Sequence, residues 1–160
     1  MQEHIIKNGK LQWEPGTMVY PIPAVMLSCG DHKDNYNIIT IAWTGTLNTN
    51  PPMLYASIRK NRHSHEIVSR TKEFVINLTN KDLAFQTDWC GVKSGKDFDK
   101  FKSMKLTPRK GESVSAPIIV ESPVNIECKV TEIREMGTHD LFVAEVVNIQ
   151  ADERYLDKRS

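Results

Sequence analysis

The sequence has no apolar run that approaches the roughly 20 residues of a transmembrane helix. Its first ten residues include Glu3, His4 and Lys7, so they lack the apolar stretch of a secretory signal peptide. Basic and acidic residues nearly cancel, because 21 Lys and Arg face 20 Asp and Glu and leave a net charge of +1. A nucleic-acid-binding protein would carry a clear basic excess. We therefore expect a soluble, cytoplasmic protein that binds neither membranes nor nucleic acids.

Cysteine is scarce as well. Cys29, Cys90 and Cys128 are an odd number of thiols without Cys-x-x-Cys spacing, which argues against a disulfide framework and against a zinc ribbon. The five histidines form no His-Glu-x-x-His pair, so no metal site is expected. A Gly-x-Ser-x-Gly nucleophile elbow is also missing. The cysteines are therefore interpreted as reduced thiols, and Cys90 as buried and inert.

Two phosphate-binding fingerprints are missing. The dinucleotide motif Gly-x-Gly-x-x-Gly does not occur, so a nicotinamide cofactor would have to bind as a transient substrate. Residues 91–97 resemble a P-loop, but three residues separate Gly91 from Gly95 where four are needed. Asp97 follows Lys96 where a magnesium-binding Ser or Thr would stand. We reject the P-loop interpretation.

The residue pattern favours strands over helices. With 160 residues, 39% hydrophobic and 26% charged, the chain has the size and composition of one globular domain, residues 1–160. A short helix is expected from Ser64 as its N-cap to about Thr71, and further N-caps at Asn80 and Asp97. Short connections and few helices favour an antiparallel barrel over a parallel sheet. Strands are expected over residues 19–28, 36–43, 53–58, 74–78, 124–130 and 141–149.

A basic stretch follows the third expected strand. Arg59 and Arg62 bring two guanidinium groups to a helix that begins near Ser64. Fork-shaped donors, a hydroxyl and free backbone N–H groups at a positive helix end suit a phosphate monoester. The alternative interpretation is a solvated basic turn after an edge strand.

The segment 36–46 ends in small and hydroxyl residues around Gly45. Such a strand end lets a flat ring approach the backbone closely and accept hydrogen bonds from N–H groups, for which residues 44–46 are the candidates. The alternative is an ordinary strand that ends in a turn.

Several motifs resemble, in order, the flavin reductase-like family, the FMN-binding split barrels that include flavoredoxin. They occur in residues 37–45, 50–53, 57–59, 62–64 and 74–78, and further on in residues 89–95, 99–101, 116–117, 125–128 and 137–140. The resemblance implies a mainly β protein, a six-stranded antiparallel split β-barrel with short inserted helices. It also implies a homodimer with FMN near the dimer interface. Family members usually continue beyond a stretch such as residues 151–156, whereas this sequence ends at Ser160.

The resemblance also implies binding residues. The FMN phosphate would be held by Arg59, Arg62 and Ser64, and the isoalloxazine ring would lie against Thr40 and the segment that follows it. The full set of expected cofactor-binding residues is Asn37, Thr40, Ala42, Trp43, Thr44, Gly45, Thr46, Ser57, Arg59, Arg62, Ser64, Asn77 and Lys100.

Two functions remain open for such a protein. An FMN-dependent oxidoreductase would take hydride from NADH or NADPH and pass electrons to free flavin, a metal complex or a redox partner protein. An electron carrier of the flavoredoxin type would bind FMN without turning over a nicotinamide, and a third possibility is a barrel that has lost its flavin.

The turn at residues 137–140 adds one catalytic candidate, His139. The resemblance places it close to the flavin, where an imidazole could orient a nicotinamide or donate to the reduced ring. The alternative is a solvated turn histidine. A homodimer is also favoured by residues 141–149, which are apolar on both faces except for Glu145 and exceed what one sheet face needs.

Overall fold

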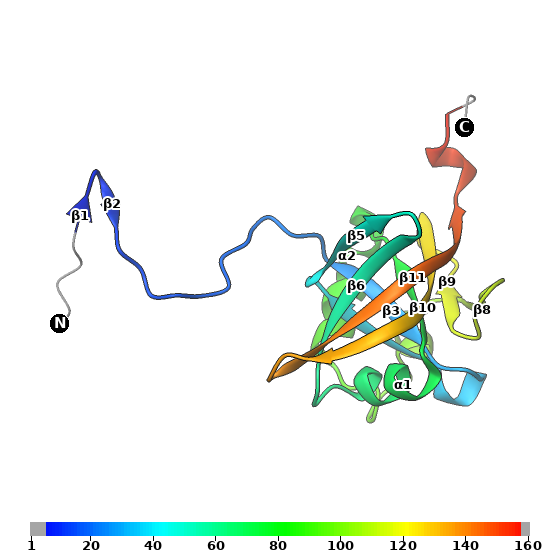
Figure 1. Cartoon of the computed structure of the whole chain (residues 1–160). Helices are drawn as coiled ribbons and strands as arrows, with labels where there is room; N and C mark the ends of the chain where they lie inside the picture. Colours follow the sequence, from blue (N-terminus) through cyan, green and yellow to red (C-terminus); the bar gives the residue numbers. More distant parts are fainter. Residues whose placement is uncertain (1–5, 158–160) are drawn as a thin grey trace.

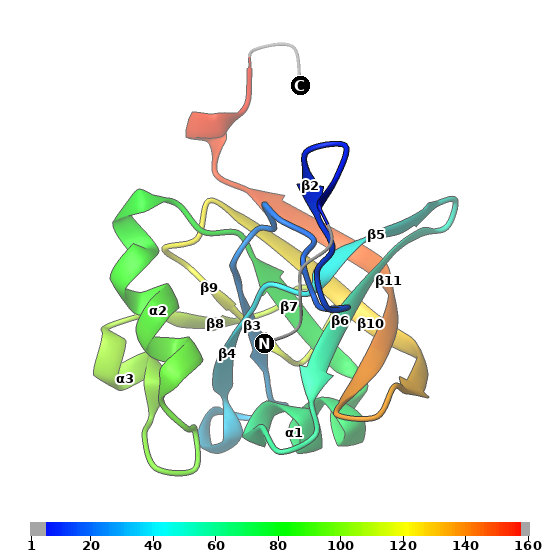
Figure 2. The same ribbon diagram turned by 90° about the vertical axis from the view of Figure 1, so that its left-hand side faces the viewer.

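The structure is a computed structural model that describes residues 6–157. Its centre is one antiparallel sheet of seven strands in the order β4-β3-β7-β10-β11-β6-β5. The strands are β3 (Val25–Cys29), β4 (Asn37–Ile41), β5 (Thr44–Thr49), β6 (Pro52–Arg59), β7 (Glu73–Asn77), β10 (Val124–Glu135) and β11 (His139–Ala151). Since β4 also approaches β6, the sheet curls into a barrel that stays open between these two strands (Figures 1 and 2).

Three helices lie outside the barrel. Helix α1 (His63–Thr71) covers one end, where Ile67 and Val68 join the barrel core. Helices α2 (Ala84–Val92) and α3 (Lys100–Met104) cover the outer side of β3 and β4 and enclose a second core. Strand β3 is therefore buried on both faces.

Short elements complete the chain. The hairpin of β8 (Pro108–Lys110) and β9 (Pro117–Ile119) packs on β7, and three 3-10 turns are η1 (Lys33–Asn35), η2 (Lys81–Leu83) and η3 (Glu153–Tyr155). Strands β1 (Ile6–Lys7) and β2 (Lys10–Leu11) form a separate hairpin at the end of an extended arm (Figure 1).

The expected fold class is confirmed, with one more strand than expected. The sheet has seven strands instead of six because residues 44–49 form β5, which pairs antiparallel with β6. Gly45 lies flat against the ring of its cross-strand partner Tyr55, where a Cβ atom would come within 3.1 Å of that ring. A strand thus occupies the place where only a strand end was expected.

Three local predictions were wrong. The first strand begins at Val25 and not at Val19, because Pro21 and Pro23 cannot donate ladder hydrogen bonds. Arg62, and not Ser64, is the N-cap of α1, and Ser64 lies buried inside the first turn. The N-cap of α3 is Asp99 and not Asp97, and the side chain of Asp99 accepts from the N–H of Lys102 at 3.0 Å. Asn80 caps η2 as expected, through bonds from two backbone N–H groups.

Candidate functional site

Two adjoining cavities lie beside the opening between β4 and β6. The first, of about 120 Å³, lies between the start of α1 and the segment that leads from α2 to α3. The second, of about 300 Å³, lies between the end of β4, the end of β6 and the start of β11. Ile39 and Arg62 line both. We call the first the polar cavity and the second the ring cavity.

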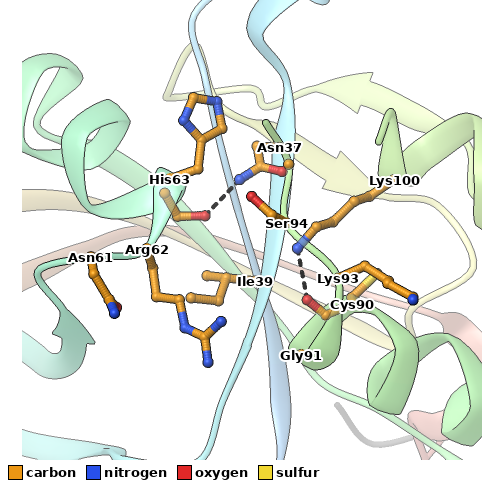
Figure 3. A pocket seen from close by; sticks show the side chains of 12 residues that line it. Asn37, Ile39, Asn61, Arg62, His63, Cys90, Gly91, Lys93, Ser94 and Lys100 are labelled. Carbon is orange, nitrogen blue, oxygen red and sulfur yellow. Dashed lines mark hydrogen bonds between the residues drawn. The ribbon is translucent and has the colours of Figure 1, made fainter. Parts of the chain in front are cut away.

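The polar cavity is built around the start of α1. Arg62 enters it from the N-cap of α1, and Lys100 enters it from the opposite side, from α3 (Figure 3). The first backbone N–H groups of α1 have no partner within the helix, so this end is electropositive. Ser64 is held from the side by Asn37, whose amide donates to its hydroxyl over 2.8 Å. With Lys93 also in its lining, the cavity combines three basic side chains with a positive helix end.

Lys100 has the most unusual environment in this cavity. Its side chain is 4% exposed, and its ammonium donates to the backbone carbonyls of Ile38 and Cys90, each over 2.7 Å. Within residues 6–157, no carboxylate forms an ion pair with it. Burial lowers the pKa of this amine, and the nearby Arg62 adds to that effect. An ammonium has three donors, so a buried cation with a donor to spare is best satisfied by a bound anion.

Gly95 closes the wall of the polar cavity. A Cβ atom here would lie 2.1 Å from Oδ1 of Asn37, so only glycine fits. Lys93 and Ser94 line the same wall. The sequence analysis missed these residues as site components, although the glycine-rich signal was noticed and set aside because its spacing does not match a P-loop.

The ring cavity is wider and more apolar. The rings of Trp43 and His139 both line it and contact each other, with centroids 4.7 Å apart and planes tilted by 36°. Trp43 is 39% exposed, so one side of this cavity faces outwards. Partial burial of His139 lowers the pKa of its imidazole, and the charge of its cross-strand partner Arg59 adds to that effect. The imidazole is therefore mainly neutral at pH 7, with one N–H donor and one acceptor nitrogen.

A network of polar side chains behind the cavity walls connects the two cavities. Asp140, next to His139, is buried and lies 2.7 Å from Nε2 of His65 in α1. It also lies 3.3 Å from the ammonium of Lys60, next to Arg59. Burial alone would raise the pKa of Asp140, but the bonds from His65 and Lys60 outweigh it and lower the pKa. This network fixes the start of α1 relative to the end of β6 and the turn before β11.

Most of the expected binding residues lie in the two cavities. The polar cavity has Asn37, Ser64 and Lys100, Arg62 lines both, and the ring cavity has Thr40, Ala42, Trp43, Ser57, Arg59 and the catalytic candidate His139. Arg59 lines only the ring cavity and not the polar cavity. This separates it from Arg62 and Ser64, with which it was expected to hold the phosphate.

Four expected residues lie outside both cavities. Thr44, Gly45 and Thr46 run along β6 as part of β5. Asn77 is fully buried in the sheet, where its amide donates to the carbonyl of Met26 and its Oδ1 accepts from the N–H of Ile119. Its polar atoms are used by the protein, so it is not part of the candidate site.

Comparison with known proteins identifies relatives of this chain. The flavin reductase like domain model matches residues 17–159. Flavoredoxin of Desulfovibrio vulgaris (Miyazaki F) is 30% identical with a TM-score of 0.87, over 94% of this chain and 81% of that one. An FMN-binding protein from Thermus thermophilus shares the fold, with 23% identity and a TM-score of 0.81 over 99% and 85% of the two chains.

A relative with an enzymatic name is the reductase component of a 4-nitrophenol 4-monooxygenase/4-nitrocatechol 2-monooxygenase of Rhodococcus opacus. It is 29% identical over 112 residues, which are 70% of this chain and 57% of the relative. Solved relatives give the architecture as a split barrel. The match to the domain model extends over nearly the whole chain, so the protein belongs to the flavin reductase-like domain family.

Proposed function

We propose that the two cavities together bind FMN, with the phosphate in the polar cavity and the isoalloxazine ring in the ring cavity. The observation that carries this proposal is the buried ammonium of Lys100, which bonds only to two backbone carbonyls among the described residues. Its cavity continues, past Arg62, into one walled by Trp43 and His139. An anion at one end and a flat ring at the other match this arrangement. A solved relative that is named as an FMN-binding protein supports the choice of ligand.

We further propose that the protein is an oxidoreductase that passes hydride from NADH or NADPH to the flavin and electrons on to an acceptor. When bound, FMN supplies the redox chemistry. Arg62, Lys100 and the start of α1 hold the phosphate. Trp43 and Ser57 wall the ring, and the neutral His139 offers one proton at the open side, where a nicotinamide would approach. The relative that is named as a reductase component supports this function.

The second candidate is an electron carrier that holds FMN but does not oxidise a nicotinamide. It is favoured by the likeness to flavoredoxin, and by the lack of a dinucleotide fingerprint in the sequence. In this case the exposed side of Trp43 would face a redox partner protein instead of a nicotinamide.

A homodimer is part of the proposal. The outward side of the sheet next to the ring cavity has partly exposed apolar side chains, among them Tyr55 on β6 and its cross-strand neighbour Val143 on β11. Ser57 and Arg59 continue the same outward side into the ring cavity. A second copy packed on this face would therefore lie directly beside the bound ring.

Mixing the purified protein with FMN and then with NADH or NADPH tests both candidates. Quenched flavin fluorescence reports binding, and loss of the oxidised flavin absorbance reports reduction. Rapid bleaching supports the oxidoreductase. A bound flavin that neither nicotinamide reduces supports the carrier, and absence of FMN binding contradicts both.

A further inference from the structure

The arm before β3 is the least explained part of the molecule. Residues 12–24 have neither helix nor strand, and they carry the β1–β2 hairpin away from the barrel (Figure 1). In the described arm, the one hydrogen bond to the body is at its root, where the hydroxyl of Thr79 donates to the carbonyl of Ala24 over 2.8 Å. An isolated two-stranded hairpin has little stability in water. The hairpin therefore needs another surface to pack on.

The arm carries large apolar side chains that the body does not cover. Trp13 and Val19 are each 80% exposed, and Leu11, Met18 and Tyr20 are more than half exposed. Five such side chains on one short segment exceed what a lone soluble chain usually presents to water. Pro15, Pro21 and Pro23 restrict the backbone between them, which lowers the entropy lost when the arm is fixed in an extended form. The composition is that of a segment that binds a surface.

The root of the arm lies at the rim of the ring cavity. Val25, the first residue of β3, pairs with Ile41 at the end of β4, and Ile41, Ala42 and Trp43 line that cavity. Figure 2, which looks onto this side, shows the arm pointing towards the viewer from the side of the body that carries β4 and β6. The arm thus leaves the molecule from the side that carries the open cavity and the apolar outward face of β6 and β11.

The length of the arm suits a second copy of this chain. Thirteen extended residues span about 40 Å, whereas a folded body of this size has a radius of gyration of about 14 Å. Two copies related by a two-fold axis, with their ring cavities on the facing sides, would each send an arm across the other. The apolar side chains of the arm would then cover the outward face that holds Tyr55 and Val143 in the other copy.

We infer that residues 6–24 form an exchange arm, which packs on a second copy of this chain and closes the open side of that copy's ring cavity. This inference rests on the proposed FMN site and names the part of the partner that completes it. Each site then consists of a polar cavity from one chain and a cover from the other.

Photo-crosslinking of isotope-mixed protein tests the arm directly. Benzoylphenylalanine replaces Trp13, and equal amounts of normal and ¹⁵N-labelled protein are unfolded, refolded together, irradiated and digested. About half of the cross-linked peptide pairs should carry both isotopes, with contacts near Trp43, Tyr55 or Val143. The matched control places the same photo-residue at Lys110 on β8, which is exposed on the opposite side from the arm (Figure 1) and should give no mixed pairs. Pairs of a single isotope, or no cross-links from position 13, overturn the inference.

A full-length variant with Trp13→Ser and Tyr20→Ser gives the second measurement. Neither side chain packs in the barrel, so the fold should be kept, which circular dichroism checks. The dimer dissociation constant from sedimentation should rise at least tenfold, and FMN and riboflavin should both dissociate at least tenfold faster. Unchanged values overturn the inference. If wild-type protein binds no FMN, the proposed function fails, while the cross-links and the sedimentation still decide the arm.

Discussion

The polar cavity and the ring cavity differ in how completely one chain builds them. In the polar cavity, Lys100 is almost fully buried, Asn37 holds Ser64, and Gly95 leaves no room for a Cβ atom. In the ring cavity, Trp43 is 39% exposed and one side faces outwards. A preorganised cavity gives affinity and selects its ligand, whereas an open one leaves room for a second reactant. Under the proposed function, the anchoring of FMN and its reaction would therefore belong to separate regions, joined at Arg62.

The largest effect is expected from Gly95→Ala. The new Cβ would lie 2.1 Å from Oδ1 of the buried Asn37, which must move and give up its bond to Ser64. Overpacking of this kind costs about 1–3 kcal/mol, so FMN affinity should fall by up to about a hundredfold in a titration followed by fluorescence. Gly91→Ala is the matched control, because its Cβ would approach Thr40 at 3.2 Å and leave Asn37 in place. Equal losses in the two variants would contradict the special role of the Gly95 wall.

The two arginines should separate the two regions. Arg62→Ala should weaken FMN binding by about ten- to a hundredfold, because a charge-assisted hydrogen bond contributes about 1.5–3 kcal/mol. Riboflavin, which lacks the phosphate, should bind almost as before. Arg59→Ala should change FMN and riboflavin affinity by similar, smaller factors, because Arg59 lines the ring cavity alone. A selective loss of FMN binding in Arg59→Ala would indicate that the phosphate binds beside Arg59 and not beside Lys100.

His139→Ala should affect rate and leave binding intact. Flavin reduction by NADH or NADPH in stopped flow should slow by about tenfold, while FMN affinity stays within about threefold, because the interaction is made in the reacting complex. The pKa of His139 is lowered below its ordinary value of 6.5. The ring therefore stays neutral until the pH falls to the lowered pKa, and it becomes charged in more acidic solution. The wild-type rate should therefore be flat from pH 7 to 8 and change in the acid range. A variant with wild-type kinetics throughout would make His139 a solvated turn residue.

The smallest effect on binding, within about threefold, is expected from Asp140→Asn, which weakens the connection between the regions. Its contact with the largely buried His65 contributes about 1–3 kcal/mol to folding, which chemical denaturation at pH 7 measures. Because the pKa of Asp140 is lowered in the folded state, this stability is present above the ordinary value of 3.8 and is lost as the pH falls through the lowered pKa. The wild type and the variant should therefore converge in acid. A constant difference at all pH values would show that the charge of Asp140 contributes nothing.

The strands rich in β-branched and apolar residues were the easiest to predict. Residues 124–130 form the first part of β10, and residues 141–149 lie within β11. The alternation in residues 124–130 does not mark the buried face, because the polar side chains of Asn125 and Glu127 are buried. Strand β5 was not predicted, since four of its six residues are exposed and it carries no hydrophobic pattern. Its existence depends on pairing with β6, which is a contact between segments and not a property of either sequence.

The residues of the candidate site could be predicted where a local sequence pattern marks them, and not where tertiary packing decides which side chains face the cavities. Arg62 and Ser64 were found from a basic turn before a helix, although Ser64 is buried in the first turn and does not cap it. Asn77 matched the family pattern, but its polar atoms bond to β3 and β9. No local pattern distinguishes an asparagine that binds a ligand from one that joins strands. The burial of Lys100 likewise follows from the position of α3 against β4, which the sequence does not reveal.

The three cysteine thiols are buried, which limits their reactivity. Burial raises the pKa of Cys29 to about 12 and that of Cys90 to about 11, and it also raises the pKa of Cys128. At pH 7 about one molecule in ten thousand has the Cys90 thiolate, which is the form that attacks disulfides. The three thiols are therefore poor nucleophiles for disulfide exchange with a partner. A single cysteine added at the surface would, for the same reason, be the one site that alkylating labels modify.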